Sequence, residues 1–159
     1  MKTKNVKRLI FAILICQLAG LVGSLFTYES IPNWYASLKM PSLNPPNWIF
    51  GPVWITLYTL MGVSLYLVWT KGLNKKNVRR AIMIFSIQLA LNSIWSILFF
   101  GLKLPFYALI EIVVLWFAIA FTIFEFYKIS EKSGLILLPY IVWVTFALFL
   151  NYNIWVLNP

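Results

Sequence analysis

Four of the eight tryptophans lie well inside long apolar stretches of the sequence, and their rings could form the walls of a ligand site. They are Trp54, Trp95, Trp116 and Trp143. Tryptophans that face lipid usually gather at the membrane surface, so rings at greater depth indicate the interior of a helix bundle. An indole offers a broad apolar face and one N–H donor, which suits a flat aromatic ligand. The alternative is that these rings fill a core, the commoner use of aromatic side chains.

The remaining tryptophans stand near the ends of the apolar stretches. They are Trp34, Trp48, Trp69 and Trp155. An indole at such a position is typical of the boundary between lipid and water, where its apolar body and its polar N–H are both accommodated. We therefore interpret these four as interface anchors.

Composition excludes several classes of chemistry. The chain has no histidine, its four acids are all glutamates, and its one cysteine, Cys16, lies in an apolar stretch. A histidine-ligated metal or haem, a Ser-His-Asp triad and an internal disulfide are therefore impossible. No metal site is expected and no cofactor is required, so any reaction would have to use the chemistry of the bound ligand itself.

The elements that must position these side chains are membrane helices. The 159 residues are 62% hydrophobic and 11% charged, whereas average chains are about 45–50% apolar. About 20 apolar residues cross a bilayer as a helix. Five such stretches lie at 9–26, 48–69, 81–100, 104–127 and 135–157. We expect an all-α membrane protein in which residues 1–159 form one five-helix bundle within the lipid bilayer. The first stretch exceeds the apolar region of a signal peptide, about 7–15 residues, and is expected to be retained.

Lysine and arginine predict the orientation of this bundle. Four basic residues precede the first stretch, five follow the second and two follow the fourth, whereas only Lys39 and Lys103 lie at the other end. The positive-inside rule then places the N-terminus in the cytoplasm and the C-terminus outside, as in a multi-pass protein of the cell membrane. Because the basic residues flank apolar segments, the net charge of +9 reflects topology, and no nucleic-acid partner is expected.

Several side chains fall at a similar depth below the extracytoplasmic surface. A helix rises about 1.5 Å per residue, which puts most of them one to two turns from the outer ends of their stretches. Within each helix they are three or four residues apart and so share a face. The set comprises Trp54, Tyr58, Gln88, Asn92, Trp95, Glu111, Trp143, Ala147 and Leu150. A pocket is expected where these faces meet.

A stiff loop between the first two stretches is expected to cover this pocket. It contains Pro41, Pro45 and Pro46, and proline fixes φ and has no N–H to donate. The loop is extracytoplasmic and leads straight into the second helix. We interpret it as a lid in which Tyr35 and Pro45 close over a ligand.

Polar residues within the stretches leave two interpretations open. An acid inside the membrane, such as Glu111, suggests function by default, but it could equally be a structural hydrogen-bond acceptor. Asn92 and Asn151 pose the same choice between bonding another helix and touching a ligand. Lys39 and Lys103 could pair with the anionic groups of a ligand or simply be solvated.

The first stretch also carries a small residue at every fourth position. These are Ala12, Cys16, Gly20 and Ser24. Small side chains let helix backbones approach closely in lipid. We expect this face to pack against a neighbouring helix of the same chain; a dimer face is the alternative.

Several motifs follow one another in a fixed order along the chain. They are Trp34-Tyr35, Pro45-Pro46, Phe50-Gly51-Pro52-Val53-Trp54, Gln88-Leu89-Ala90-Leu91-Asn92 and Pro139-Tyr140 followed by Trp143. In order and spacing they resemble the TspO/MBR family of tryptophan-rich sensory proteins, whose mitochondrial relatives are the translocator proteins or peripheral benzodiazepine receptors. The resemblance covers essentially the whole chain.

The resemblance implies a five-helix bundle that binds tetrapyrroles, chiefly protoporphyrin, and isoquinoline or benzodiazepine-type drugs, and that forms homodimers. In bacterial members it implies light- and oxygen-dependent porphyrin degradation, which the family assigns to the pair matched by Trp54 and Trp143. These two are the candidate catalytic residues. The candidate ligand-binding residues are Tyr35, Pro45, Trp54, Tyr58, Asn92, Trp95, Tyr107, Glu111, Trp143, Ala147 and Leu150.

The resemblance also has one departure and leaves alternatives. Mitochondrial members carry a sterol motif near the end of the fifth helix, but no basic residue follows Tyr152 here, so that motif is broken. A transporter of porphyrins or other amphiphiles remains an alternative, although no paired repeat or broken helix is indicated. A ligand-responsive regulatory or scaffold protein, docking through the basic segment 71–80, is another.

Overall fold

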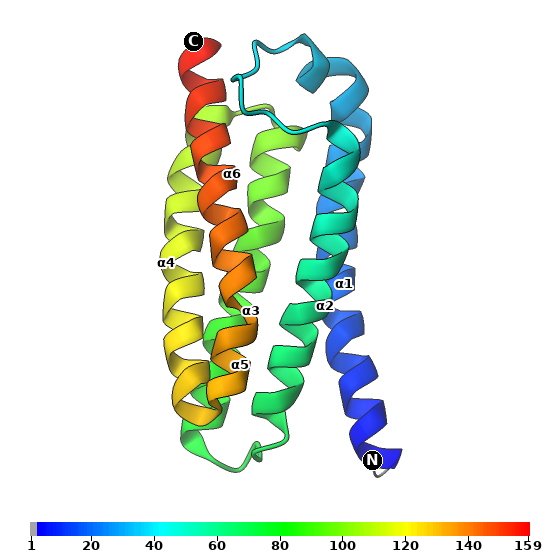
Figure 1. Ribbon diagram of the computed structural model, residues 1–159, viewed down its shortest axis with the longest axis vertical. Coiled ribbons are helices and arrows are strands. Elements are labelled where there is room, and N and C mark those ends of the chain that lie inside the picture. The colour runs from blue at the N-terminus through cyan, green and yellow to red at the C-terminus, as the bar shows by residue number, and fades with distance from the viewer. Residues whose placement is uncertain (1–2) are drawn as a thin grey trace.

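The computed structural model describes residues 3–159, which form helices and short connections, with no strand among them. Figure 1 shows long helices running side by side, with the two ends of the chain at opposite ends of the bundle. The short elements η1 and η3 are wide π turns, and η2 is a 3-10 turn. In chain order the elements are α1 (Thr3–Ser30), η1 (Ile31–Tyr35), η2 (Asn47–Ile49), α2 (Phe50–Trp69), α3 (Lys76–Ser96), η3 (Ile97–Gly101), α4 (Pro105–Ile129), α5 (Glu131–Ile136) and α6 (Leu138–Leu157).

Within the described residues, five segments are long and apolar enough to cross a membrane. They are Asn5–Tyr35, Asn47–Trp69, Lys76–Gly101, Pro105–Ile129 and Glu131–Leu157. Large apolar side chains are exposed on the outside of the bundle, among them Leu18, Leu25 and Val142. Such faces are stable against lipid, and the helices satisfy their own backbone hydrogen bonds there. The predicted five-helix membrane bundle is confirmed, and the chain is a multi-pass membrane protein.

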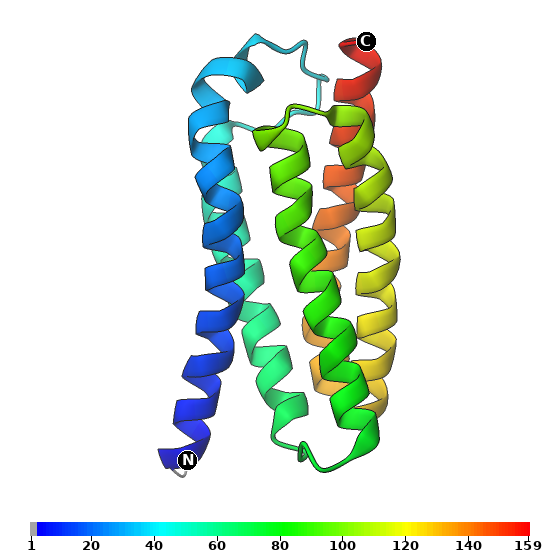
Figure 2. The same ribbon diagram turned by 180° about the vertical axis from the view of Figure 1, so that it is seen from behind.

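The helices form a closed ring. α1 packs against α2 on one side and α3 on the other, and α4 lies between α3 and α6. Figure 2 shows α1, α3 and α4 side by side from behind. α2 completes the ring, meeting α5 more extensively than α6. The contact between α2 and the last span is therefore concentrated at the end of the bundle that carries α5.

The first helix continues beyond the apolar stretch that predicts it. The stretch stops at residue 26, whereas α1 ends at Ser30 and η1 ends at Tyr35. Pro32 has no N–H to donate to the preceding turn, and the chain widens there into the π turn η1. Tyr35 therefore lies at the end of a helix and not in a free loop.

The fifth span is interrupted, so the expectation of unbroken helices is wrong at this point. α5 ends at Ile136 and α6 begins at Leu138, with Pro139 in its first turn. Proline suits the first turn of a helix but cannot donate to the turn before it. Just before this proline, the N–H of Leu137 donates to the carbonyl of Gly134, three residues earlier, at 3.1 Å, so the chain makes a tight turn there. The break lies at the end of the bundle opposite the long loop (Figure 1).

Small residues bring α1 and α2 into close contact. Ala12 and Cys16 are fully buried in the core that these helices share. A Cβ atom added at Gly62 would lie 2.5 Å from the Cα atom of Ile13. The expected use of the small-residue face for packing within the chain is confirmed at these positions.

Glu125 is a second acid buried in a membrane helix, with a side chain only 4% exposed. Arg80 donates from Nε to its Oε2 at 3.1 Å, and Arg80 Nη2 contacts the same oxygen. The Nζ of Lys128 lies 3.5 Å from Oε1. These pairs join α3 to α4 near the basic end of the bundle, where a buried carboxylate needs cationic partners.

We predict that Gly62→Val lowers the free energy of unfolding by about 1–3 kcal/mol, because the added side chain must displace the backbone of Ile13. Thermal unfolding of the full chain in detergent measures this. Gly51→Val is the matched control, since a Cβ at Gly51 meets no heavy atom within 4 Å. Equal losses of stability in the two variants would contradict the proposed contact.

Candidate functional site

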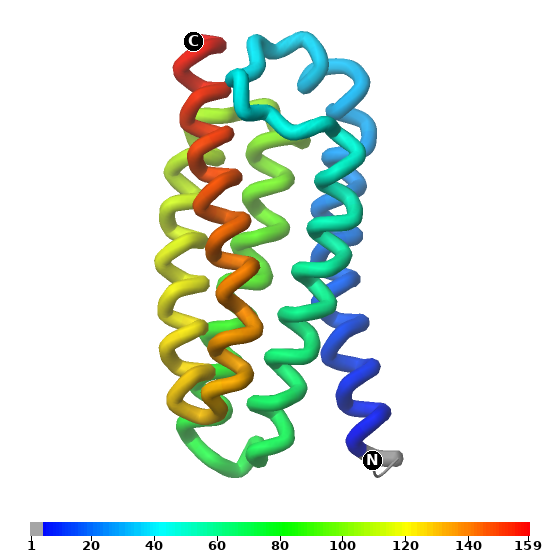
Figure 3. The backbone as a smooth tube through the Cα atoms, in the orientation of Figure 1, coloured from blue at the N-terminus to red at the C-terminus, as the bar shows by residue number. Residues whose placement is uncertain are grey.

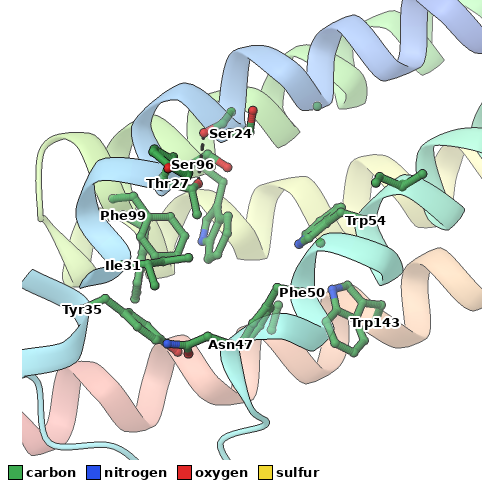
Figure 4. A pocket seen from close by; sticks show the side chains of 18 of the residues that line it. Ser24, Thr27, Ile31, Tyr35, Asn47, Phe50, Trp54, Ser96, Phe99 and Trp143 are labelled. Atoms are coloured by element: carbon green, nitrogen blue, oxygen red, sulfur yellow. Dashed lines mark hydrogen bonds between the residues drawn. The ribbon is translucent and has the colours of Figure 1, made fainter. Parts of the chain in front are cut away.

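A cavity of about 560 Å³ lies in the half of the bundle nearest the long loop. Its walls come from α1, the start of α2, the end of α3 and the part of α6 from Trp143 to Ile154, and η1, η2 and η3 contribute near the loop. Figure 4 shows labelled side chains from these elements pointing toward a common space. α4 contributes no lining residue, because α3 and α6 stand between it and the cavity.

The cavity opens sideways between α1 and α2. Its exposed lining residues come from these two helices and from η2, and they include Leu21, Ser24, Gly51 and Ile55. Its lining residues from α6 are buried or half-buried. Because these helices are membrane spans, the mouth faces the bilayer near its surface.

Trp54 and Trp143 lie together at the deeper end of the cavity (Figure 4). The Trp54 ring stacks on Tyr58, with ring centroids 5.5 Å apart and planes 30° apart. The Trp143 ring meets Phe50 edge to face at 6.0 Å. The buried Nε1 of Trp143 has no acceptor within the described part of the chain, so one donor remains available beside the cavity.

Tyr35 forms part of the roof. It is 5% exposed, lines the cavity, and its hydroxyl is 3.0 Å from Asn44 Oδ1, to which it donates. The loop is also held to the end of α6, because Asn158 accepts from the Lys39 N–H at 2.9 Å and donates to its carbonyl at 3.1 Å. Figure 3 shows this loop crossing the end of the bundle. Pro45 is half-buried in the loop but does not line the cavity.

The opposite wall is built around Trp95. Its ring stacks on Phe99 at 5.3 Å, and its Nε1 donates to Asn151 Oδ1 at 3.0 Å. Asn151 also donates to the Pro105 carbonyl at 2.8 Å, and so joins α3, α4 and α6. Of the two interpretations left open for this asparagine, the interhelical bond is the one observed, although Asn151 also lines the cavity.

A buried chain of hydrogen bonds lies beneath the cavity floor. The Tyr58 hydroxyl donates to Asn92 Oδ1, and Asn92 Nδ2 donates to the Tyr140 hydroxyl at 3.0 Å. Tyr140 in turn donates to Gln88 Oε1 at 3.0 Å. Asn92 does not itself line the cavity; it holds the lining residue Tyr58 to α3 and α6.

Two candidates on α4 lie away from the cavity. Glu111 is buried, and neither carboxylate oxygen has a hydrogen-bond partner among residues 3–159. Tyr107 is 58% exposed on the outer face of α4, where its ring contacts Phe106. Neither side chain could touch a ligand in the cavity without rearrangement of the bundle.

Seven of the eleven predicted ligand-binding residues therefore line one cavity. They are Tyr35, Trp54, Tyr58, Trp95, Trp143, Ala147 and Leu150. The structure does not bring four others to it, namely Pro45, Asn92, Tyr107 and Glu111. Position along a helix predicts depth, but only the rotation of each helix in the bundle decides which side chains face the cavity.

Neither outer lysine lines the cavity. Lys39 is exposed in the loop, and Lys103 lies in a separate surface groove. The cavity lining contains no charged residue. An anionic ligand would therefore have to leave its charged groups at the mouth.

Depth along a helix does not fully distinguish the tryptophans that line the cavity from those that do not. Trp116 is deep in α4, but it packs toward α6, where its Nε1 donates to Thr145 Oγ1 at 2.8 Å. Trp48 is 74% exposed, as expected of an interface anchor, yet it also lines the mouth.

α1 contributes residues to the site that the sequence did not predict there. Gln17, Ser24 and Thr27 all line the cavity. Gln17 Nε2 donates to the Ile55 carbonyl and to Thr59 Oγ1, both at 3.0 Å, which closes the lower end of the mouth. The sequence signal for such residues is a polar side chain within an apolar helix, as at Gln17 and Thr27.

Comparison with known proteins agrees with this architecture. The model of the TspO/MBR family matches residues 12–156. The chain is 44% identical to the tryptophan-rich protein TspO of Archaeoglobus fulgidus over 97% of its length and 99% of that protein. It is 41% identical to the protein of the same name from Chlorobaculum tepidum, over 98% and 99% of the two chains. It is also 40% identical to the human translocator protein, over 84% and 80%. With a match over nearly its full length, the chain belongs to the TspO/MBR family.

Proposed function

We propose that this membrane protein binds a flat tetrapyrrole of the protoporphyrin class in the cavity beneath the loop. The observation that carries the proposal is the uncharged lining rich in aromatic residues, with Trp54 and Trp143 at its deeper end. The cavity volume of about 560 Å³ falls within the range of about 300–1,000 Å³ that is usual for small-molecule sites. Flat aromatic drugs of the isoquinoline or benzodiazepine type would compete for the same space.

The chemistry of the lining also supports one orientation of such a ligand. The apolar ring system would be buried between the indoles, since aromatic faces favour stacked or edge contacts. The propionates cannot be buried in an uncharged lining, because a desolvated carboxylate without a partner is costly. They would project through the mouth between α1 and α2, toward water and lipid headgroups.

We predict that Trp143→Ala weakens protoporphyrin binding about threefold to tenfold, the loss expected for one aromatic contact. The absorbance of the porphyrin, titrated with the full chain in detergent, gives the dissociation constant. Trp116→Ala is the control, because Trp116 is equally deep but does not line the cavity. An unchanged affinity in Trp143→Ala, or an equal loss in both variants, would place the ligand elsewhere.

The position assigned to the propionates gives a second prediction. Protoporphyrin dimethyl ester should bind within about threefold of the free acid, because exposed charges contribute little to binding. Both ligands can be compared by competition against one fluorescent porphyrin. A loss of tenfold or more on esterification would mean that a cation recognises the carboxylates.

Light-dependent porphyrin degradation is a second candidate activity. Two indoles against one cavity would hold a photosensitising ring in place while dioxygen supplies the oxidant. Both oxygen atoms would add across one double bond of the macrocycle, and cleavage of that bond would leave two carbonyl groups. This step needs no electrons, metal or acid–base residue from the protein, since the ligand carries the chemistry.

We predict that illumination in air bleaches bound protoporphyrin, and that bleaching slows at least about tenfold when oxygen is removed, because oxygen is consumed in the reaction. Loss of the Soret absorbance follows the reaction. Bleaching at the same rate in Trp54→Phe, Trp143→Phe and wild type, with binding intact, would leave the protein as a binder and remove these residues from the chemistry.

We further propose that the loop end faces outside the cell membrane, because the basic residues of the described chain gather at the opposite end. The cavity would then accept its ligand from the outer leaflet. Passage across the bilayer would need a second opening toward the basic end, and the lining extends no deeper in that direction than Gln17 and Tyr58. Binding is therefore favoured over transport, and the homodimer stays a prediction.

A further inference from the structure

A second concave site lies on the outside of the bundle, where the end of α1 meets η3 at the loop end. The groove is lined by residues of both segments and has a volume of about 420 Å³. Its floor is a close helix contact, because a Cβ at Gly101 would come within 2.8 Å of the Phe26 ring. Phe100 lines both this groove and the central cavity, and so stands between the two.

The lining of the groove changes from apolar to polar along α1 and η1. Leu25 and Phe26 form the part nearer the membrane centre, and Glu29, Ser30 and Asn33 follow toward the surface. Successive residues in α1 lie about 1.5 Å farther along the helix axis. An amphiphile lying in this groove would therefore place its chain along Leu25 and its headgroup beside Glu29.

The headgroup end of the groove holds one charge of each sign. Glu29 comes from α1, and Lys103 from the turn after η3. The two do not pair with each other: within residues 5–159, the only carboxylate in an ion pair is that of Glu125. Both charges remain free to bind complementary groups on one ligand.

Two further features distinguish this groove from an ordinary surface depression. Ser30 is 5% exposed, and its Oγ is buried without a hydrogen-bond partner among the described residues. Lys103 has a φ of 57°, the one positive φ outside glycine in the described chain. That conformation is unfavourable for a residue with a side chain, and such strain concentrates at ligand sites.

We propose that this groove binds the headgroup of a zwitterionic phospholipid with a primary ammonium, as in phosphatidylethanolamine. Lys103 would bind the phosphate, and the Glu29 carboxylate would accept hydrogen bonds from the ammonium. A primary ammonium can donate these bonds, whereas the quaternary ammonium of choline cannot. The amphipathic ring of Trp34, which also lines the groove, suits the headgroup layer.

The test uses the full chain in detergent, titrated with phosphatidylethanolamine, phosphatidylcholine or phosphatidylglycerol of identical acyl chains, with bound lipid counted by native mass spectrometry. Wild type should hold phosphatidylethanolamine about threefold to tenfold more tightly than either competitor, the difference expected for charge-assisted hydrogen bonds at an exposed site. Glu29→Gln should reduce phosphatidylethanolamine to the affinity of phosphatidylcholine. Lys103→Gln should weaken binding of all three lipids.

The chain offers matched controls at its other end. Glu131 and Lys132 are adjacent, exposed and outside both cavities, so Glu131→Gln and Lys132→Gln should change none of the affinities. Equal binding of the three lipids by wild type, preference for phosphatidylglycerol, or equal effects in the control variants would overturn the proposal. Porphyrin affinity, measured in parallel, reports the central cavity separately, because Glu29 and Lys103 do not line it.

Discussion

The close approach of α1 to α2 through small residues is the contact on which the rest of the structure depends. Near the basic end, Gly62 lets the backbone of Ile13 come within van der Waals reach, and Gly20 accommodates the ring of Tyr58. Farther along the same two helices, the surroundings of Gly51 are open. The two helices are in close contact at one end and less closely packed at the other, which leaves the cavity beneath the loop with a mouth between them.

The bilayer imposes a second constraint, since polar groups within it must find partners inside the protein. Asn92 meets this by bonding Tyr58 and Tyr140, Gln88 does so through its carbonyl oxygen, and Arg80 does so for Glu125. The Glu111 carboxylate is an exception, because it has no partner among the described residues. The bonds of the other residues hold the floor and the basic end of the bundle in fixed geometry. The lining above them is uncharged, so a ligand there would be selected by shape and aromatic contact, and the proposed recognition of charge lies in the surface groove at Lys103.

The sequence was enough to predict the five membrane helices, the membrane class and seven cavity residues, because apolar length and helical spacing report on these directly. It was not enough to exclude Tyr107 and Glu111, since the rotation of α4 depends on packing against α3 and α6. The break at Leu137 follows from the missing N–H of Pro139, and a hydropathy pattern alone does not predict it. The contribution of Gln17 depended on where α1 meets α2, which only tertiary contacts determine.

The central claim is that a flat tetrapyrrole occupies the cavity between Trp54 and Trp143, beneath the roof at Tyr35. A crystal or cryo-electron microscopy structure of the full chain with protoporphyrin would test it most directly. The account predicts density for the macrocycle against both indoles, with the propionates at the mouth between α1 and α2. Density confined to the outer surface of the bundle, with the cavity unchanged, would contradict it.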